Sequence, residues 1–306
     1  MSELDSSVSD GNSRSAGQSP SLFRWLESSL DRLRGLRKAK DSLLPTSKRV
    51  GLALSGGGAL GAAHIGVLQV LAEHGVRPHC VAGTSAGSAV GAVYCAGLSL
   101  ALIEEVALHL EWSQIGRVVR PKSGFFDGSR LEQSLVRLIG DRSFDQMITP
   151  FACAAVDILR DELVILREGK VAPAVRASCA FPGVFTPVES EGRLLVDGGL
   201  MNNLPVAVLR EMGAEYLIAV DLSGSTLPRT PPGSLLEMWF MSLSTLTRLT
   251  HHETTLAQVV ICPDVGRYNG IDLGQIPDLI KRGREAAEGA MPGILRDLGV
   301  EGKGAS

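Results

Sequence analysis

A serine at position 85 lies in a setting typical of a nucleophile. Residues 83–87 read Gly-x-Ser-x-Gly, directly after the apolar pair 81–82 and directly before the helical run 88–96. A strand that turns at once into a helix strains its turn residue, and the flanking glycines remove Cβ atoms that would clash there. The hydroxyl then lies at a helix N-terminus, where unpaired amides stabilise a forming alkoxide or oxyanion. The motif predicts that Ser85 is a nucleophile, although alone it also fits a plain structural turn.

A second glycine-rich loop lies upstream of this serine. Residues 55–61 read Ser-Gly-Gly-Gly-Ala-Leu-Gly, follow the strand-like run 50–54 and open a helix. The spacing from Gly56 fits the dinucleotide-binding fingerprint, in which an acidic residue ends the next strand. No acidic residue lies between Glu73 and Glu104, so the confirming residue is missing. The alternative is an oxyanion hole, in which successive glycine amides point into one small space beside the serine.

A serine nucleophile needs a base, and histidine is the usual candidate. His64 lies in the helix after the glycine loop, where a packed or capping residue is the simpler interpretation. His251 and His252 come late enough for the Ser, acid, His order of an α/β-hydrolase, but no glycine turn aims them. The other three lie in polar or ordinary amphipathic stretches: His74, His79 and His109. None of the six presents a convincing site.

An aspartate is the better candidate for the base. The strand-like run 193–196 ends at Asp197, which is followed by Gly198 and Gly199. Such a turn can leave a carboxylate facing a neighbouring loop. Another Asp-Gly pair begins at Asp127, where a helical run follows and a turn or cap residue is expected.

Together these three motifs resemble those of the patatin-like phospholipase family. They occur in the family's order, and their residues are Gly56-Gly57-Gly58 with Gly61, Gly83-x-Ser85-x-Gly87, and Asp197-Gly198-Gly199. Further likeness lies in residues 177–185, 203–206 and 213–221. The resemblance therefore covers roughly residues 48–225.

The resemblance implies a Ser-Asp dyad, in which Ser85 attacks an acyl ester and Asp197 takes its proton without any histidine, cofactor or metal. It implies an oxyanion hole built from backbone amides, with the candidates Gly56, Gly57, Gly58, Ala59, Gly61 and Ala86. The family acts on ester-linked fatty acyl chains of phospholipids, lysophospholipids or neutral glycerides. Leu60 stands where many members carry Arg or Lys, which weakens the argument for a cation that steers a phosphate headgroup.

The composition fits one large α/β domain. The chain has 306 residues, of which 44% are hydrophobic and 21% charged, and can bury a full core. Apolar runs alternate with amphipathic helices and predict a three-layer αβα fold with a mostly parallel central sheet. The strand-like runs are 50–54, 151–155, 163–166, 194–196, 216–220 and 259–262. We expect an acyl hydrolase domain over residues 46–300, with a nucleophile elbow, after an N-terminal extension over residues 1–45.

Charge and cysteine usage limit the partners and the compartment. A formal net charge of −3 gives no global basic field for nucleic acid. The five cysteines lie among apolar neighbours without metal-ligand spacing, which predicts small buried residues in a reducing compartment: Cys80, Cys95, Cys153, Cys179 and Cys262. No Sec-type signal is visible, and no apolar run approaches the roughly 20 residues of a spanning helix. We expect a cytoplasmic protein that is soluble or peripheral to a membrane.

Two segments are candidates for peripheral membrane contact. After a Ser- and Gly-rich, disorder-prone stretch, residues 21–40 form a basic amphipathic helix of the kind that lies on an anionic bilayer. Packing on the domain or on a partner subunit is the alternative. The apolar run 235–241 follows a proline-rich breaker and fits a lid or an interfacial anchor, or an ordinary core or dimer helix. Four aromatics are candidates for an acyl pocket or for plain core: Phe125, Phe126, Phe181 and Phe185.

Three classes of function remain. The leading hypothesis is a serine esterase of the phospholipase A or lysophospholipase type, acting on a phospholipid or lysophospholipid. The second is a catalytically weak lipid- or protein-binding regulatory protein on the same fold. The third, a dinucleotide-dependent oxidoreductase, lacks its ribose-binding acid. Acyl transfer to an acceptor other than water, the headgroup, the chain length and the oligomeric state stay open.

Overall fold

The computed structural model describes residues 48–120, 123–224, 231–247 and 252–300. The chain divides into two units, Met1–Lys40 and Asp41–Ser306, and every described residue belongs to the second. The predicted N-terminal extension over residues 1–45, with its basic segment 21–40, lies outside the described residues. That extension and its boundary therefore stay predictions.

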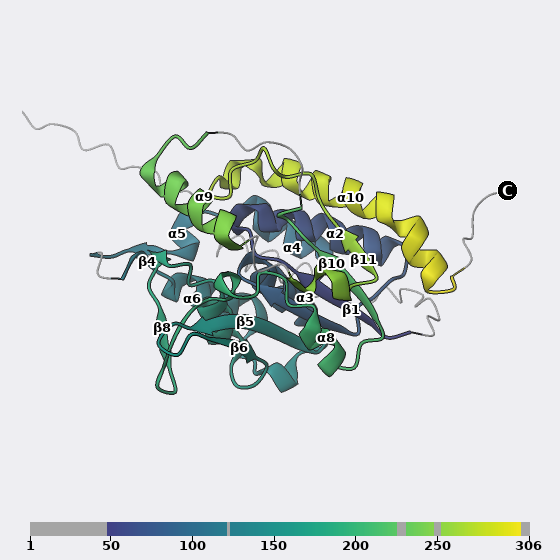
Figure 1. Cartoon of the computed structure of the whole chain (residues 1–306), viewed down its shortest axis with the longest axis horizontal. Helices are drawn as coiled ribbons and strands as arrows, with labels where there is room; N and C mark the ends of the chain where they lie inside the picture. The colour runs from purple at the N-terminus through teal and green to yellow at the C-terminus, as the bar shows by residue number, and fades with distance from the viewer. Residues whose placement is uncertain (1–47, 121–122, 225–230, 248–251, 301–306) are drawn as a thin grey trace, which may run out of the picture. The chain divides into compact units, whose positions relative to one another are not determined.

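A mixed β-sheet forms the middle layer of the second unit (Figure 1). Its strand order is β11-β10-β1-β2-β5-β9-β8, and β6 pairs with β5. The five strands from β11 to β5 run parallel, whereas β6 and β9 are antiparallel to β5, and β8 is antiparallel to β9. The strands are β1 (Val50–Leu54), β2 (Cys80–Thr84), β5 (Phe151–Asp157), β6 (Glu162–Leu166), β8 (Val188–Ser190), β9 (Arg193–Asp197), β10 (Tyr216–Val220) and β11 (Val259–Ile261).

Helices cover both faces of this sheet. Side chains that alternate along the strands separate the two cores: Leu52 and Ile218 face α2, α3 and α10, whereas their neighbours Ala53 and Leu217 face α8. The central parallel strands are buried along their whole length, as strands covered on both faces must be. The predicted three-layer α/β fold with a mostly parallel sheet is confirmed. These helices are α2 (Ala63–Glu73), α3 (Ala86–Cys95), α8 (Ala207–Glu211) and α10 (Ile276–Asp297).

The remaining elements are a small second sheet, further helices and short 3-10 helices. A small second sheet has the order β3-β4-β7, with β3 (Arg117–Val118), β4 (Gly124–Asp127) and β7 (Gly183–Phe185). The other helices are α4 (Leu100–Leu108), α5 (Trp112–Ile115), α6 (Ser129–Ile139), α7 (Val171–Ser178) and α9 (Leu235–Thr247). Short 3-10 helices are η1 (Gly58–Ala62), η2 (Phe144–Gln146), η3 (Gly198–Leu200), η5 (His252–Leu256) and η6 (Leu273–Gln275). No helix among those described is both long and apolar enough to cross a bilayer.

The cysteines follow the predicted burial only in part. Cys80, Cys95 and Cys153 are buried, and Cys179 is partly buried. Cys262 is exposed, so the prediction is wrong at this position. The residue directly follows β11, which is the edge strand of the sheet formed by the described residues.

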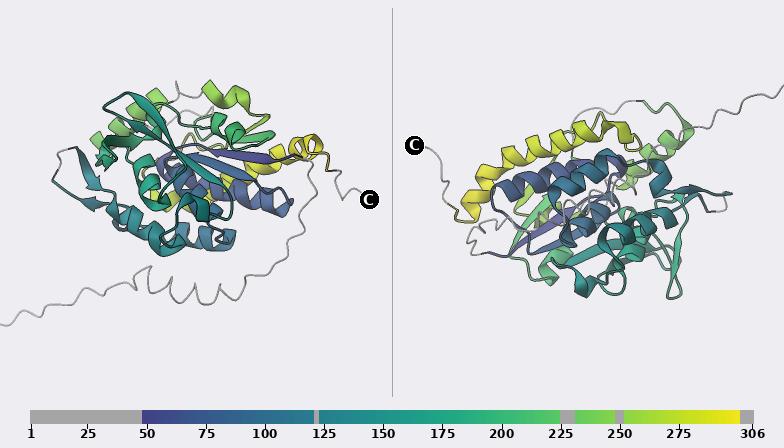
Figure 2. Two further views of the ribbon diagram at one scale, coloured as in Figure 1. Left: turned by 90° about the horizontal axis from the view of Figure 1, so that it is seen from below. Right: turned by 180° about the vertical axis from the view of Figure 1, so that it is seen from behind.

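Helix α10 packs closely along α2, as both Figure 1 and the rear view in Figure 2 show. A Cβ at Gly283 would collide with the carbonyl of Ala63, whereas nothing lies within 4 Å of a Cβ at Gly289 in the same helix. We therefore expect Gly283→Ala to lower the free energy of unfolding by about 1–3 kcal/mol through overpacking. Gly289→Ala is the matched control and should raise it by up to about 1 kcal/mol, because alanine favours the helix. Urea unfolding measures both, and equal effects would contradict the close helix packing.

Candidate active site

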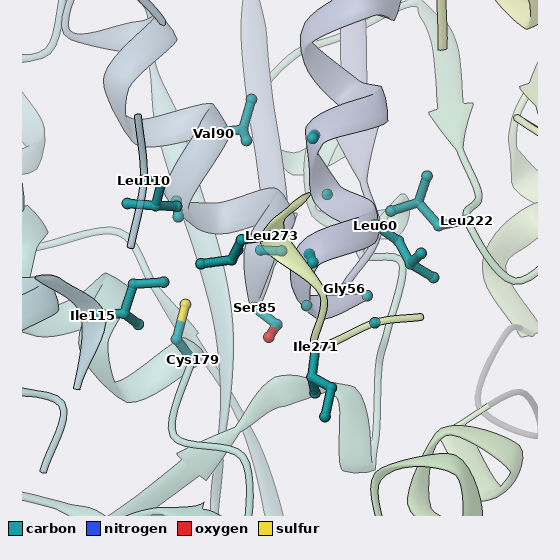
Figure 3. A pocket seen from close by; sticks show the side chains of 18 of the residues that line it. Gly56, Leu60, Ser85, Val90, Leu110, Ile115, Cys179, Leu222, Ile271 and Leu273 are labelled. Atoms are coloured by element: carbon teal, nitrogen blue, oxygen red, sulfur yellow. The ribbon is translucent and has the colours of Figure 1, made fainter. Parts of the chain in front are cut away.

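Ser85 occupies the sharp turn between β2 and α3. Its φ of 51° and ψ of −123° lie in a region that residues other than glycine rarely adopt. The Ser85 amide donates to Oγ of Ser178 at 3.0 Å. The Ser85 carbonyl accepts from the amide and the hydroxyl of Ser88, at 2.9 and 2.6 Å. These hydrogen bonds hold the strained backbone and leave the Ser85 hydroxyl at the cavity (Figure 3).

Two close contacts bring the glycine loop against this turn. A Cβ at Gly87 would collide with the carbonyl of Leu54, the last residue of β1. A Cβ at Gly61 would lie 2.5 Å from the Cβ of Ala86. Only glycine fits at either position, so the loop after β1 and the turn after β2 pack directly on each other.

Asp197 reaches the same cavity from β9. Across β5, Thr84 pairs with Ala154 and Asp197 pairs with Ala155, so the register sets the end of β9 level with the end of β2. One carboxylate oxygen, Oδ1, accepts from the Gly199 amide at 2.8 Å. The other, Oδ2, is buried and has no hydrogen-bond partner within the described part of the chain.

The environment of Asp197 changes its acidity. Burial raises the pKa of its carboxyl to about 6, while the Ser85 hydroxyl and the Gly199 amide act in the opposite direction. The Ser85 hydroxyl is thus close enough to influence the pKa, although Oδ2 forms no hydrogen bond of normal geometry. A carboxylate with a pKa near 6 is ionised at neutral pH and keeps one buried oxygen available to accept a proton.

Two of the backbone amides predicted for the oxyanion hole already donate hydrogen bonds within the protein. The Gly56 amide donates to the carbonyl of Asn203 at 3.1 Å, and the Ala59 amide donates to the carbonyl of Gly270 at 2.7 Å. An amide that already donates to a carbonyl cannot also stabilise an oxyanion. These hydrogen bonds make Gly56 and Ala59 structural members of the loop, and the predicted donors narrow to the other amides.

Three candidate amides remain. Gly57, Gly58 and Ala86 donate to no acceptor among the residues that the structure describes. Gly61 lies inside η1, and its contribution is the close contact with Ala86. The number of glycines in a loop cannot show which amides are free, so the sequence alone could not make this distinction.

Two neighbours of Ser85 carried no predicted role at the site. Ser178 is fully buried and orients the Ser85 amide. Cys179 lies in the cavity wall beside Ser85 (Figure 3). Burial, followed by the charge of Asp197, raises the pKa of the Cys179 thiol to about 12, so it is not a nucleophile at neutral pH. In sequence both look like ordinary core residues at the end of a helix.

The described histidines do not reach the cavity. His64 is fully buried, and its Nε2 lies 2.8 Å from the Ser55 carbonyl. Burial lowers the pKa of His64 to about 4, so the ring is neutral at pH 7, and its interpretation as a packed residue is confirmed. The rings of His74, His79 and His109 bond to backbone groups of their own neighbourhoods. His251 and the side chain of His252 lie outside what the structure describes.

An apolar cavity of about 340 Å³ opens at Ser85. Figure 3 shows some of the aliphatic side chains in its wall, among them Leu60, Val90, Leu110, Ile115 and Leu273. Among the described residues that line it, the charged ones are Asp197 and Glu237, and none is Lys, Arg or His.

The four phenylalanines predicted for an acyl pocket divide into two groups. Phe181 and Phe185 line the cavity, and Phe126 packs on Phe185 with ring centroids 6.1 Å apart. Phe125 is 52% exposed, so it belongs neither to the cavity wall nor to the core.

Helix α9 forms part of the cavity wall. Glu237 and Met241 line the cavity, and the Trp239 indole donates to the carbonyl of Pro182 at 3.0 Å. Leu235 is 85% exposed, and Met238 and Trp239 are each about half exposed. The predicted apolar segment 235–241 is therefore a helix that faces the cavity on one side and presents apolar side chains to solvent on the other. A fully buried core helix is excluded.

Comparison with known proteins finds relatives of this chain. An uncharacterized NTE family protein of Mycobacterium tuberculosis is 38% identical over 183 residues, which are 59% of this chain and 51% of the relative. Patatin-like phospholipase domain-containing protein 6 of Homo sapiens is 33% identical over 207 residues, or 64% of this chain and 15% of that protein. The chain thus spans about half, or less, of the length of these relatives.

Likeness to solved structures is lower. VipD from Legionella pneumophila has a TM-score of 0.49 and 16% identity, over 84% of this chain and 71% of that chain. The sequence model of the family described as patatin-like phospholipase matches residues 52–210, more than half of the chain. The chain therefore belongs to the patatin-like phospholipase family.

Proposed function

We propose that this protein is a serine acyl hydrolase that cleaves fatty acyl ester bonds of lysophospholipids, phospholipids or related lipids. One observation supports this most strongly: the Ser85 hydroxyl and the unpaired Oδ2 of Asp197 meet at one apolar cavity. Beside them, the amides of Gly57, Gly58 and Ala86 have no acceptor among the described residues. A nucleophile, a base and oxyanion donors around one apolar pocket are the parts that ester cleavage needs.

The proposed reaction has two steps. Ser85 Oγ attacks the ester carbonyl carbon while Asp197 Oδ2 takes the hydroxyl proton, and the free amides stabilise the tetrahedral oxyanion. The intermediate collapses to an acyl-Ser85 ester, and Asp197 returns the proton to the departing alcohol. Water then attacks the acyl ester with Asp197 again as base, which releases the fatty acid and restores Ser85. An acceptor alcohol in place of water would give acyl transfer.

A catalytically weak binding protein on the same fold is the alternative. The strained backbone of Ser85 costs on the order of 1–3 kcal/mol, and a buried carboxylate without a second partner is also unfavourable. Binding a lipid passively requires neither feature. Both costs fall on the two residues with assigned chemical roles, which favours catalysis.

The partner implied by this function is a lipid surface. Substrate acyl chains lie in a bilayer or micelle, and the cavity wall includes α9, whose outer side carries Leu235 and Met238. Exposed apolar side chains next to an apolar cavity fit insertion into the surface that holds the substrate. We therefore assign α9 as a lipid-contacting element of a peripherally associated enzyme.

Covalent labelling tests the nucleophile. A fluorophosphonate probe should label the wild-type protein and should not label Ser85→Ala. Release of fatty acid from lysophospholipid should fall by about 10⁴-fold or more in Ser85→Ala, because the dyad acts as one unit. In the wild type, kcat/KM should rise with pH through about 6, the pKa of Asp197. A wild type that neither labels nor releases fatty acid would favour the binding-protein alternative.

Burial of the ionised Asp197 carboxylate lowers the free energy of unfolding. A variant with a neutral side chain at this position should therefore be more stable, although inactive. Between about pH 4 and 6 the unfolded chain has lost the Asp197 proton while the folded chain keeps it, so stability falls as the pH rises through this window. Above pH 6 the loss in free energy of unfolding stays constant at about 3 kcal/mol. We expect Asp197→Asn to gain up to this amount in free energy of unfolding at pH 8, and the gain to fade toward pH 4. Denaturant unfolding at several pH values measures it, and a gain independent of pH would contradict the raised pKa.

Vesicle binding tests α9. Leu235→Ser with Met238→Ser should weaken binding of the full chain to neutral phosphatidylcholine vesicles by about 10-fold or more, because less apolar area enters the lipid. Neutral lipid keeps the basic segment 21–40 from dominating the measurement. Hydrolysis of a water-soluble short-chain ester should change little. Leu159→Ser is the matched control, because this residue is 68% exposed and does not line the cavity; equal losses in both proteins would count against a specific role of α9.

A further inference from the structure

A pair of asparagines connects the three parts of the site. The Asn202 carbonyl accepts from the Thr84 hydroxyl at 2.9 Å, just before the nucleophile. The Asn203 carbonyl accepts from the Gly56 amide at 3.1 Å, in the glycine loop. The backbone N–H of Asn202 donates to the Gly198 carbonyl at 2.8 Å, in the turn that follows the candidate base. The position of this dipeptide therefore sets the spacing between nucleophile, oxyanion loop and base.

The side chain of Asn202 is held at both ends. Its Oδ1 accepts from the Leu204 amide at 3.2 Å, and its Nδ2 donates to Oε1 of Glu253 at 2.8 Å. The other oxygen of Glu253, Oε2, accepts from the Ala207 amide at 2.6 Å. Asn202 is only 5% exposed. A flip of its side-chain amide would break both hydrogen bonds and leave buried polar groups without partners.

We propose that Glu253 is a positioning residue of this site. Its carboxylate fixes Asn202, and through Asn202 and Asn203 it fixes the strand end before Ser85, the glycine loop and the turn after Asp197. This inference rests on the acyl hydrolase function proposed above.

The type of residue at position 253 fits this role. Both of its oxygens accept from N–H donors, and hydrogen bonds to a charged acceptor are roughly twice as strong as neutral ones. A neutral amide of the same shape offers one acceptor in place of two. Glu253 comes from η5, 51 residues after Asn202, so no local turn enforces the contact. The carboxylate itself holds the two segments together.

The test exchanges donor and acceptor across this contact. Glu253→Gln leaves one N–H facing another N–H, and Asn202→Asp sets two carboxylates against each other. The double variant Asn202→Asp/Glu253→Gln restores every bond: the new amide donates to the new carboxylate, and the Leu204 and Ala207 amides keep their acceptors. Its net charge equals that of the wild type, one hydrogen bond reverses its direction, and the negative charge moves from position 253 to position 202.

The readouts separate positioning from folding. We would measure the rate of fluorophosphonate labelling, kcat and KM on a water-soluble ester, and Tm for each full-length protein. Displacement of reacting groups by about 1 Å costs up to 10²-fold in rate, so each single variant should label about 10- to 100-fold more slowly, with KM changed less than about threefold. The double variant should recover to within about threefold of the wild type. Glu211→Gln, which removes an exposed ion pair with Arg167, is the matched control and should leave the rate unchanged.

The outcomes distinguish this inference from the function on which it rests. A wild type that does not label overturns the acyl hydrolase function itself. If the wild type labels, single variants with wild-type rates overturn the positioning role. Rate losses that only follow the fraction of unfolded protein overturn it as well. So does a double variant whose loss in labelling rate equals the combined losses of the two single variants.

Discussion

The strained backbone at Ser85 is the constraint on which the rest of the site depends. A non-glycine residue with a φ of 51° persists only where its surroundings fix it. Here the Ser178 hydroxyl holds the Ser85 amide, and the contact of Gly87 with the Leu54 carbonyl ties the turn to the end of β1. Because β1 also leads into the glycine loop, the strain at Ser85 and the position of that loop have one cause.

The position and the hydrogen bonding of the Asp197 carboxyl are a second constraint on the site. The pairing of β9 with β5 sets its level in the sheet, and the Gly199 amide satisfies only one of its oxygens. The other oxygen stays unpaired, and burial raises the pKa of the carboxyl to about 6. A group arranged for stability alone would have a second donor here. Because no second donor is present among the described residues, this oxygen is free to take the Ser85 proton in the reaction that we propose.

Local patterns were enough to predict most of the fold and to single out Ser85 and Asp197 as the candidate reacting residues. The apolar runs became the buried strands β1, β5 and β10, and the Gly-x-Ser-x-Gly and Asp-Gly-Gly patterns marked turns that the structure brings to one cavity. The small sheet β3-β4-β7 escaped prediction because its strands have two to four residues, too few to show a period. The roles of Ser178 and Asn203 escaped it because their hydrogen bonds join segments far apart in the chain.

The chain between β10 and β11 links the apolar surface to the reacting groups. It starts at Asp221, and the amide of the next residue, Leu222, donates to the Ser55 hydroxyl at 3.0 Å beside the glycine loop. It carries α9, and it returns at Glu253, which holds Asn202. The segment with the exposed apolar side chains is therefore anchored at one end to the glycine loop and at the other end to the asparagine pair. Helix α9 also borders the cavity directly through Glu237 and Met241, so one segment of the chain carries both the exposed apolar side chains and part of the cavity wall.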